Sequence, residues 1–129
     1  PIQMAAGVYP LGDPKADSVL CVTTNFSLTY FSIAGELENS GYPSHLLVCD
    51  TEGLSVLTAW AAGKFDAEKI AKAVKEFKLP DTLSHKKIIL PGGVAVLKGD
   101  LEDELPDWEI LVGPREAMAI GSYLKQNWS

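Results

Sequence analysis

Continuous apolar runs alternate along the chain with segments of helical periodicity. Residues 18–24 (SVLCVTT) and 45–50 (HLLVCD) are rich in aliphatic and β-branched side chains, as strands buried on both faces are. Shorter apolar runs at 87–90 (KIIL) and 109–112 (EILV) predict two further strands. Each of the four runs leads into a stretch that contains Gly, Pro or hydroxyl residues, where a strand is expected to end.

The segments between these strands predict helices. Asp66 is placed to cap a helix whose apolar residues recur at helical spacing, and Gly41 is placed to end the first one. Pro114 is expected at an early position of the last helix, where its missing N–H does no harm. The expected helices are 27–40, 54–62, 67–77, a short one within the acidic stretch 99–107, and 114–126.

Strands that alternate with helices specify a mostly parallel sheet, so we expect an α/β fold, a three-layer Rossmann-like or flavodoxin-like domain. With 129 residues the chain can bury one core. Residues 1–17, interrupted by Gly and Pro, are expected to be a linker or an irregular lead-in, and residues 18–129 to form the domain. Because it begins at Pro1, we expect the chain to be either a processed chain or a piece cut from a longer polypeptide.

Charge and cysteine content exclude several classes of protein. The net charge of -6 argues against nucleic-acid binding, which requires clustered Lys and Arg. No apolar run approaches the ~20 residues of a membrane span, so a cytoplasmic location is expected. Cys21 and Cys49 lie within apolar runs, which favours buried thiols over a disulfide. Two cysteines cannot supply a four-cysteine iron–sulfur cluster site.

The loops that follow the four strands should converge, because the carboxyl ends of parallel strands meet at one edge of the sheet. These loops are 23–27, 50–54, 91–94 and 113–116, and they carry hydroxyls, amides and glycines. They could cradle a large ligand that has a phosphate and several amides. They contain no evident catalytic residues, and neither a glycine-rich dinucleotide fingerprint nor a Walker loop is present.

Several of these residues also have a purely structural interpretation. Asn25 and Ser27 could cap the first helix, with or without a ligand contact. Gly92 and Gly93 could form a turn and nothing more. Arg115, the only arginine, could meet a phosphate or form a local salt bridge with an acidic neighbour.

The short helix expected over 54–62 has an unusual face. Leu54, Thr58 and Ala61 share that face, which narrows to small side chains. Such a helix could lie flat against a broad planar object. The pattern alone favours a close packing contact with another helix.

Four segments together resemble one known family. They are VTTNFSLTYF (22–31), VCDTEGLSVLTAWAAGKF (48–65), ILPGGVAVL (89–97) and WEILVGPREA (108–117). In this order they resemble the C-terminal corrinoid-binding domain of the corrinoid iron–sulfur protein large subunit, equivalently the gamma subunit of archaeal acetyl-CoA decarbonylase/synthase. The resemblance extends over about residues 18–125.

The resemblance implies a cobamide held base-off, with its nucleotide tail along the sheet edge and its corrin ring on the helix 54–62. It implies that Thr58 lies nearest the lower face of cobalt, which would lack a strong protein ligand. No catalytic residue and no metal ligand is expected. The candidate cofactor-binding residues are Thr23, Thr24, Asn25, Ser27, Thr29, Thr51, Glu52, Gly53, Ser55, Leu57, Thr58, Pro91, Gly92, Gly93, Val94, Gly113, Pro114, Arg115, Glu116 and Ala117.

The function implied is that of a methyl-carrier domain of the acetyl-CoA (Wood–Ljungdahl) pathway rather than a stand-alone enzyme. The domain would shuttle a methyl group from methyltetrahydrofolate, by way of a methyltransferase, to acetyl-CoA synthase. The implied partners are the corrinoid iron–sulfur protein small subunit, the methyltransferase, acetyl-CoA synthase and a reductive activator. The alternative is a flavin- or nucleotide-binding domain on the same fold.

Overall fold

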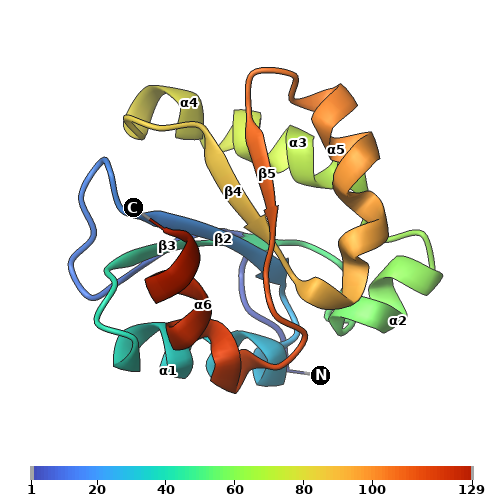
Figure 1. The fold of residues 1–129 in the computed structure, drawn as a ribbon. Helices are drawn as coiled ribbons and strands as arrows, with labels where there is room; N and C mark the ends of the chain where they lie inside the picture. The colour runs from blue at the N-terminus through green and yellow to red at the C-terminus, as the bar shows by residue number, and fades with distance from the viewer. Residues whose placement is uncertain (1, 129) are drawn as a thin grey trace.

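One sheet of five strands, in the order β1-β3-β2-β4-β5, forms the centre of the molecule (Figure 1). The computed structural model describes residues 2–128. Only β1 is antiparallel to its neighbour, and the other pairs of adjacent strands are parallel. The expected α/β fold with a mostly parallel sheet is confirmed, and the arrangement is consistent with a Rossmann-like fold. The strands are β1 (Gly7–Leu11), β2 (Val19–Thr24), β3 (Ser44–Cys49), β4 (Lys87–Leu90) and β5 (Glu109–Val112).

The helices occupy most of the segments in which the sequence predicts them. Asp66 caps α3 as expected, since its carboxylate accepts a hydrogen bond from the Lys69 backbone N–H at 2.8 Å. The helices are α1 (Ser27–Asn39), α2 (Val56–Ala61), α3 (Ala67–Glu76), α4 (Leu79–Thr82), α5 (Lys98–Glu104) and α6 (Ile120–Asn127), with 3-10 turns η1 (Gly92–Leu97) and η2 (Ala117–Ala119). None of the described helices is long and apolar enough to cross a membrane.

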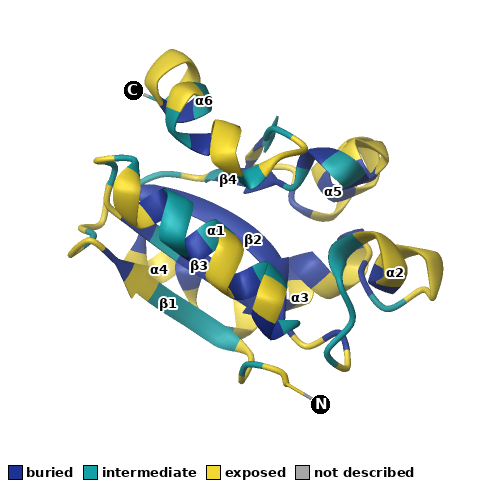
Figure 2. Cartoon of the chain, turned by 90° about the horizontal axis from the view of Figure 1, so that it is seen from below, coloured by how far each residue is buried: buried dark blue, intermediate teal, exposed yellow. Residues whose placement is uncertain are grey.

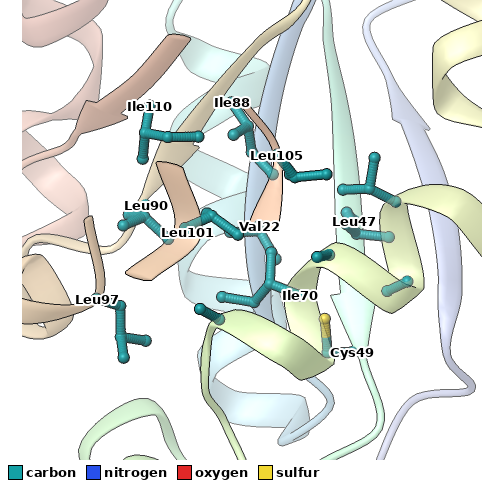
Figure 3. Packing of buried hydrophobic residues seen from close by; sticks show 14 of the residues in the cluster. Val22, Leu47, Cys49, Ile70, Ile88, Leu90, Leu97, Leu101, Leu105 and Ile110 are labelled. Atoms are coloured by element: carbon teal, nitrogen blue, oxygen red, sulfur yellow. The ribbon is translucent and has the colours of Figure 1, made fainter. Parts of the chain in front are cut away.

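Two hydrophobic clusters lie on opposite faces of the sheet, because successive side chains of a strand point to opposite sides. Leu20 and Val22 of β2 belong to the cluster beneath α3 and α5 (Figure 3), whereas Val19 and Cys21 belong to the cluster beneath α1 and α6. Burial follows the same division, with exposed residues on the outer faces of the helices (Figure 2). The continuous apolar run of β2 is therefore explained by its burial on both faces.

The structure differs from the sequence prediction within residues 1–17, which were expected to be irregular. Gly7–Leu11 form β1, an edge strand that pairs antiparallel with β3 from Gly7 opposite Val48 to Leu11 opposite Ser44. Gly7 and Pro10 obscure this strand in the sequence. Proline is tolerated there because an edge strand has one side free of ladder hydrogen bonds.

The last helix also differs from the prediction, because it does not include Pro114. Residues 113–116 form a loop instead, and the helical conformation begins at η2 and continues as α6. The Gly113 N–H donates to the Leu90 carbonyl at 2.8 Å, and the Pro114 carbonyl accepts from the Gly92 N–H at 3.2 Å. These bonds hold the loop against the end of β4, so the helical conformation begins only at Ala117.

The centre of the sheet is loosely paired. β2 and β3 share register from Val19 opposite Ser44 to Thr24 opposite Cys49, whereas β2 and β4 pair only at Cys21 and Ile89. The carboxyl-terminal ends of β2 and β4 are therefore not joined by a ladder. Side chains and loops, rather than backbone pairing, fill the space at that edge.

At the opposite edge, His85 connects the start of β2 to the start of β4. The Lys87 backbone N–H donates to His85 Nδ1 at 3.0 Å, so Nε2 carries the ring proton and donates to the Ser18 carbonyl at 2.7 Å. The ring also meets Trp128 edge-on, with centroids 4.9 Å apart. Burial lowers the pKa of His85 below its ordinary value of 6.5, and the Lys87 ammonium lowers it further, although the bond to Ser18 opposes this shift.

This arrangement predicts a loss of stability in acid. Because the pKa of His85 is lower in the folded than in the unfolded chain, its contribution is fully present above pH 6.5 and is lost as pH falls through the lowered value. Urea unfolding between about pH 7 and about pH 5 should show a falling midpoint for the parent chain and a flatter dependence for His85→Gln. His45→Gln, which leaves His85 intact, should keep the acid-side fall. If the urea midpoint of His85→Gln fell as much as that of the parent chain, His85 would not be the source of the loss of stability in acid.

Candidate functional site

A cleft of about 390 Å³ opens at the carboxyl edge of the sheet, beside β2 and β4. This volume lies in the range of small-molecule sites, roughly 300–1,000 Å³. Its walls come from the end of β2, the first half of α1, the end of β4 and the loop after β5. The lining residues are Cys21, Val22, Thr23, Leu28, Thr29, Ser32, Ile33, Val56, Ile89, Leu90, Pro91, Gly113, Pro114, Arg115, Glu116, Ala117 and Ile120.

The strand order explains why the cleft is there. From β2 the chain passes through α1 to β3 on one side of β2, and from β3 it passes through α2, α3 and α4 to β4 on the other side. The connections diverge above β2, which is where open α/β sheets leave a crevice for ligands. β2 and β4 pair only at Cys21 and Ile89, so no ladder joins the two strands at this edge.

The interior of the cleft is mostly apolar, with a small number of hydroxyls. Thr23 is only 3% exposed and lines the cleft, while Thr29 is half-buried and Ser32 is exposed. Within residues 2–128, no side-chain hydrogen bond of the structure uses these three hydroxyls. The charged side chains of Arg115 and Glu116 are exposed. Thr23 is therefore the buried hydroxyl that remains available to a ligand.

Asn25, directly after β2, uses its side-chain oxygen to hold the loop that follows β3. Its Oδ1 accepts from the backbone N–H groups of Thr51 at 2.9 Å and Gly53 at 3.0 Å, and from the Thr51 hydroxyl at 3.1 Å. Thr51 is fully buried, and Gly53 has a φ of +77°, a conformation that favours glycine. The loop 51–53 is thereby fixed to the end of β2.

The other end of the Asn25 amide holds the N-terminal segment. Its Nδ2 lies 3.0 Å from Gln3 Oε1, 3.2 Å from the Met4 carbonyl and 3.3 Å from Asp50 Oδ1. The Met4 N–H in turn donates to the Asn25 carbonyl at 2.8 Å. Both ends of the amide are thus occupied within the chain, so its contribution to the site is structural.

The helix-cap interpretation of Asn25 and Ser27 is wrong. The N-cap of α1 is Phe26, and no side chain makes a capping hydrogen bond there. Instead, the hydroxyls of Ser27 and Thr24 are buried and have no hydrogen-bond partner among the described residues. Neither residue lines the cleft.

Gly92 packs closely against the backbone of the loop that follows β5. A Cβ on Gly92 would lie 2.5 Å from the Gly113 carbonyl oxygen and 2.8 Å from the Arg115 nitrogen, and one on Gly113 would lie 2.9 Å from Ile89 Cγ2. Real Cβ atoms do not approach so closely. The absence of side chains at these glycines lets the loop after β4 and the loop after β5 pack together, which positions one wall of the cleft.

The helix α2 presents its small side chains outward. Thr58, Ala61 and Ala62 are exposed, and Ala59 is the buried residue of the helix. The Ser55 hydroxyl donates to Thr58 Oγ1 at 3.1 Å. No other described helix covers this face, so close helix packing does not explain its small residues.

Exposed large apolar side chains flank the cleft. Leu28 and Phe31 on α1 are 71% and 62% exposed, Leu57 on α2 is 57% exposed, and Met118 of η2 is 78% exposed. Leu28 lines the cleft. Leu57 and Met118 directly follow Val56 and Ala117, which also line it. The rim is therefore apolar on three sides, which is typical of a surface that meets another molecule.

The structure brings only part of the predicted site into the cleft. Those that line it are Thr23, Thr29, Pro91, Gly113, Pro114, Arg115, Glu116 and Ala117. Ser55, Leu57 and Thr58 lie on α2 or at its start, Val94 is buried in the core, and Gly93 faces Leu57. Glu52 forms an exposed ion pair with Lys64 at 2.9 Å.

Most of the apolar lining was not among the sequence candidates. On α1, Leu28 and Ser32, and likewise Thr29 and Ile33, are four residues apart and form one stripe. That stripe was the available signal, because the helix after the first parallel strand borders the crevice. The other lining residues that sequence reasoning missed are Cys21, Val22, Val56, Ile89, Leu90 and Ile120.

The cysteines do not form a reactive site. Cys21 and Cys49 are free and buried, as expected, and burial raises the pKa of each thiol to about 12. The thiols are therefore neutral at ordinary pH. Among residues 2–128, no group of three or more His, Cys, Asp and Glu side chains could hold a metal ion. Fold and cleft together define an α/β domain with a cleft of small-molecule size at the carboxyl edge of its sheet.

Comparison with known proteins gives the family. A family model described as CdhD, CO dehydrogenase/acetyl-CoA synthase delta subunit, matches residues 1–124. The chain belongs to this family. It is 51% identical over 127 residues to the corrinoid/iron-sulfur protein large subunit of Moorella thermoacetica, covering 98% of this chain and 28% of that protein.

Archaeal relatives are named as gamma subunits. The chain is 38% identical over 128 residues to the acetyl-CoA decarbonylase/synthase complex subunit gamma of Archaeoglobus fulgidus, covering 99% of this chain and 27% of that one. It is also 38% identical to the subunit of the same name in Methanocaldococcus jannaschii, with 99% and 26% coverage. The chain thus spans about a quarter of the length of these relatives.

The Asn25 contacts predict a large effect of one substitution. Asn25→Ala would leave the buried N–H groups of Thr51 and Gly53 without their acceptor, so it should lower the free energy of unfolding by about 2–5 kcal/mol. Urea denaturation measures the change. Asn39→Ala, at the exposed end of α1, is the matched control and should change stability by less than about 0.5 kcal/mol. Similar stabilities for the two variants would show that the Asn25 contacts contribute little.

Proposed function

We propose that the chain is a corrinoid-binding, methyl-carrier domain of the acetyl-CoA pathway, with a three-layer Rossmann-like architecture. The observation that carries this proposal is the cleft between β2 and β4, lined by the buried, unpaired hydroxyl of Thr23 and flanked by the exposed small-residue face of α2. The resemblance to corrinoid iron–sulfur protein large subunits supports the choice of ligand.

The residues present fit a cobamide in two parts. The cleft has room for a flat base and its ribose, but the corrin macrocycle is too large to enter it. The macrocycle would instead lie at the mouth, against Thr58, Ala61 and Ala62 of α2, with Leu28 and Leu57 as apolar contacts. Arg115, exposed and without an ion pair among the described residues, would meet the phosphate.

When bound, the cobamide would supply the redox-active cobalt that accepts and passes on a methyl group. The chain's own contribution would be to hold the nucleotide tail away from the metal and to present no strong ligand beneath it. Thr58 suits that role, because its hydroxyl already accepts a hydrogen bond from Ser55. A hydroxyl is in any case a poor ligand for cobalt compared with imidazole or thiolate.

The partners would be the other components of methyl transfer. We infer a small subunit that covers the upper face of the ring, a methyltetrahydrofolate methyltransferase, acetyl-CoA synthase and a reductive activator. The relatives that are named as subunits of an acetyl-CoA decarbonylase/synthase complex support membership of such an assembly. The apolar rim, including Phe31 and Met118, offers a surface for a partner of this kind.

Reconstitution tests the proposal directly. The chain should retain hydroxocobalamin through gel filtration, and the bound cofactor should have the absorption spectrum of the base-off form, since its tail would lie in the cleft. The same experiment with flavin mononucleotide serves as the comparison. Retention of flavin but not of cobalamin would overturn the proposal in favour of a flavin-binding domain on the same fold.

A substitution on α2 tests the position of the ring. Thr58→His would place an imidazole, a good metal ligand, on the exposed face of α2, so it should shift the spectrum of bound cobalamin and make its reduction harder. Glu68→His, which puts the same group on the exposed side of α3, should change neither property. If the Thr58→His spectrum and reduction midpoint equal those of the parent, α2 does not lie beneath cobalt.

A further inference from the structure

The N-terminal residues 2–4 lie across the point where β2 ends and α1 begins, and we call them the strap. The Ile2 carbonyl accepts a hydrogen bond from the first N–H of α1 at 3.2 Å, and the Met4 N–H donates to the Asn25 carbonyl at 2.8 Å. Gln3, between them, forms an isolated antiparallel bridge to the chain after β2. The strap is therefore joined by its backbone to the start of α1.

The strap also meets the loop 51–53 through the side chain of Gln3. Gln3 Oε1 lies 3.0 Å from Nδ2 of Asn25, the residue whose side-chain oxygen holds that loop. A Cβ on Gly53 would lie 3.4 Å from Gln3 Cβ and 3.5 Å from Gln3 Cδ, so the side chain of Gln3 covers the backbone of Gly53. The strap thus contacts both the loop and the residue that holds it.

Most of the acceptors around the Asn25 amide nitrogen come from the strap. They are Gln3 Oε1 at 3.0 Å and the Met4 carbonyl at 3.2 Å, and the third acceptor is Asp50 Oδ1 at 3.3 Å. The amide has two protons to donate. Without the strap, only the Asp50 carboxylate would remain to orient it.

The loop 51–53 has a strained backbone that depends on contacts from outside it. Glu52 has a φ of +58° and Gly53 a φ of +77°, and this left-handed conformation is unfavourable for Glu52 because it has a Cβ. The bonds that oppose this strain run to Asn25 Oδ1 and, from the Glu52 N–H, to Asp50 Oδ1 at 2.9 Å. The loop is expected to relax when these bonds weaken.

The helix α2, which follows this loop, has little of its own to hold it in place. It has six residues, too few for a helix to be stable by itself, and Ala59 is its buried residue. An alanine side chain buries little apolar area. The position of α2 therefore depends on the segments that flank it, which are the loop 51–53 on one side and the buried Phe65 on the other.

The strap itself is held by few contacts and lies mostly in solvent (Figure 2). Ile2 is 74% exposed and Gln3 is exposed, whereas Met4 is half-buried against the cluster beneath α1 and α6. Segments with little buried apolar area open at a lower cost in free energy than the core does. The strap can therefore leave its position while the sheet remains folded.

We propose that the strap is a releasable clamp that controls the order of the loop 51–53 and of α2. When the strap is released, the Asn25 amide loses two acceptors, Gly53 loses its cover and the strained loop relaxes, so α2 becomes mobile. A contact that draws residues 2–4 away from Asn25 would thus loosen α2 without touching it. No bound cofactor is needed for this coupling, so its test is independent of the proposed function.

Amide hydrogen exchange of the full chain, followed by mass spectrometry, measures the coupling. Gln3→Met keeps a long side chain over Gly53 but removes the acceptor oxygen, so it should speed exchange within residues 51–61 about two- to tenfold. Exchange in β4 and α5 should not change. Gln126→Met, the same substitution at an exposed glutamine of α6, is the matched control and should leave residues 51–61 unaffected.

A second variant releases the strap through its backbone. Met4→Pro removes the N–H that donates to the Asn25 carbonyl, so exchange within residues 51–61 should rise about five- to fiftyfold. Ala5→Pro is the control, since the Ala5 N–H makes no hydrogen bond to any of the described residues. Circular dichroism should show that all four variants are folded.

Two results would overturn the inference. Exchange within residues 51–61 that stays at the parent rate in Met4→Pro would show that the strap leaves without affecting α2. Exchange that rises equally in β4, α5 and residues 51–61 would show that the strap belongs to the cooperative fold and is not a separate clamp. A rise confined to residues 51–61 in both strap variants, and absent from both controls, supports it.

Discussion

The hydrogen bonds of one buried amide, that of Asn25, connect three parts of the chain that lie far apart in the sequence. Its oxygen holds Thr51 and Gly53 after β3, and its nitrogen holds the N-terminal segment at Gln3 and Met4. The loop 51–53 leads directly into α2. The position of α2 relative to the end of β2 therefore depends on a side chain that touches neither the cleft nor α2 itself.

A second constraint, the close packing of Gly92 on the loop after β5, acts on the other side of the cleft. With 2.5 Å between a hypothetical Cβ and the Gly113 carbonyl oxygen, no side chain fits at Gly92. The backbone bonds Gly92 to Pro114 and Gly113 to Leu90 reinforce this contact. The cleft thus has one wall fixed by backbone packing and a neighbouring helix positioned by a side-chain amide, which explains how weak pairing between β2 and β4 is tolerated.

How much of this could be predicted from the sequence depended on whether the signal was local. The parallel strands and most helices were predicted correctly, because the apolar runs and the Asp66 cap are local features. The strand β1 was missed because its pairing with β3 is long-range and its Gly7 and Pro10 resemble loop residues. The last helix was predicted to begin at Pro114 rather than at Ala117, because the bonds that hold residues 114–116 out of the helix come from the end of β4. The interpretation of Asn25 as a cap failed for the same reason, since its partners are 21 to 28 residues away.

The two parts of the proposed site, the cleft and the exposed face of α2, differ in the side chains that form them. The cleft is lined mostly by aliphatic side chains and by the fixed loop after β5, and in the proposed function it would hold the nucleotide tail. The α2 face is exposed and carries Thr58, Ala61 and Ala62, so in the proposed function it would support the ring without adding a strong ligand to the metal. Affinity and reactivity would then arise from different residues. A chain built this way could retain its cofactor while the open face of the ring is presented in turn to different partners.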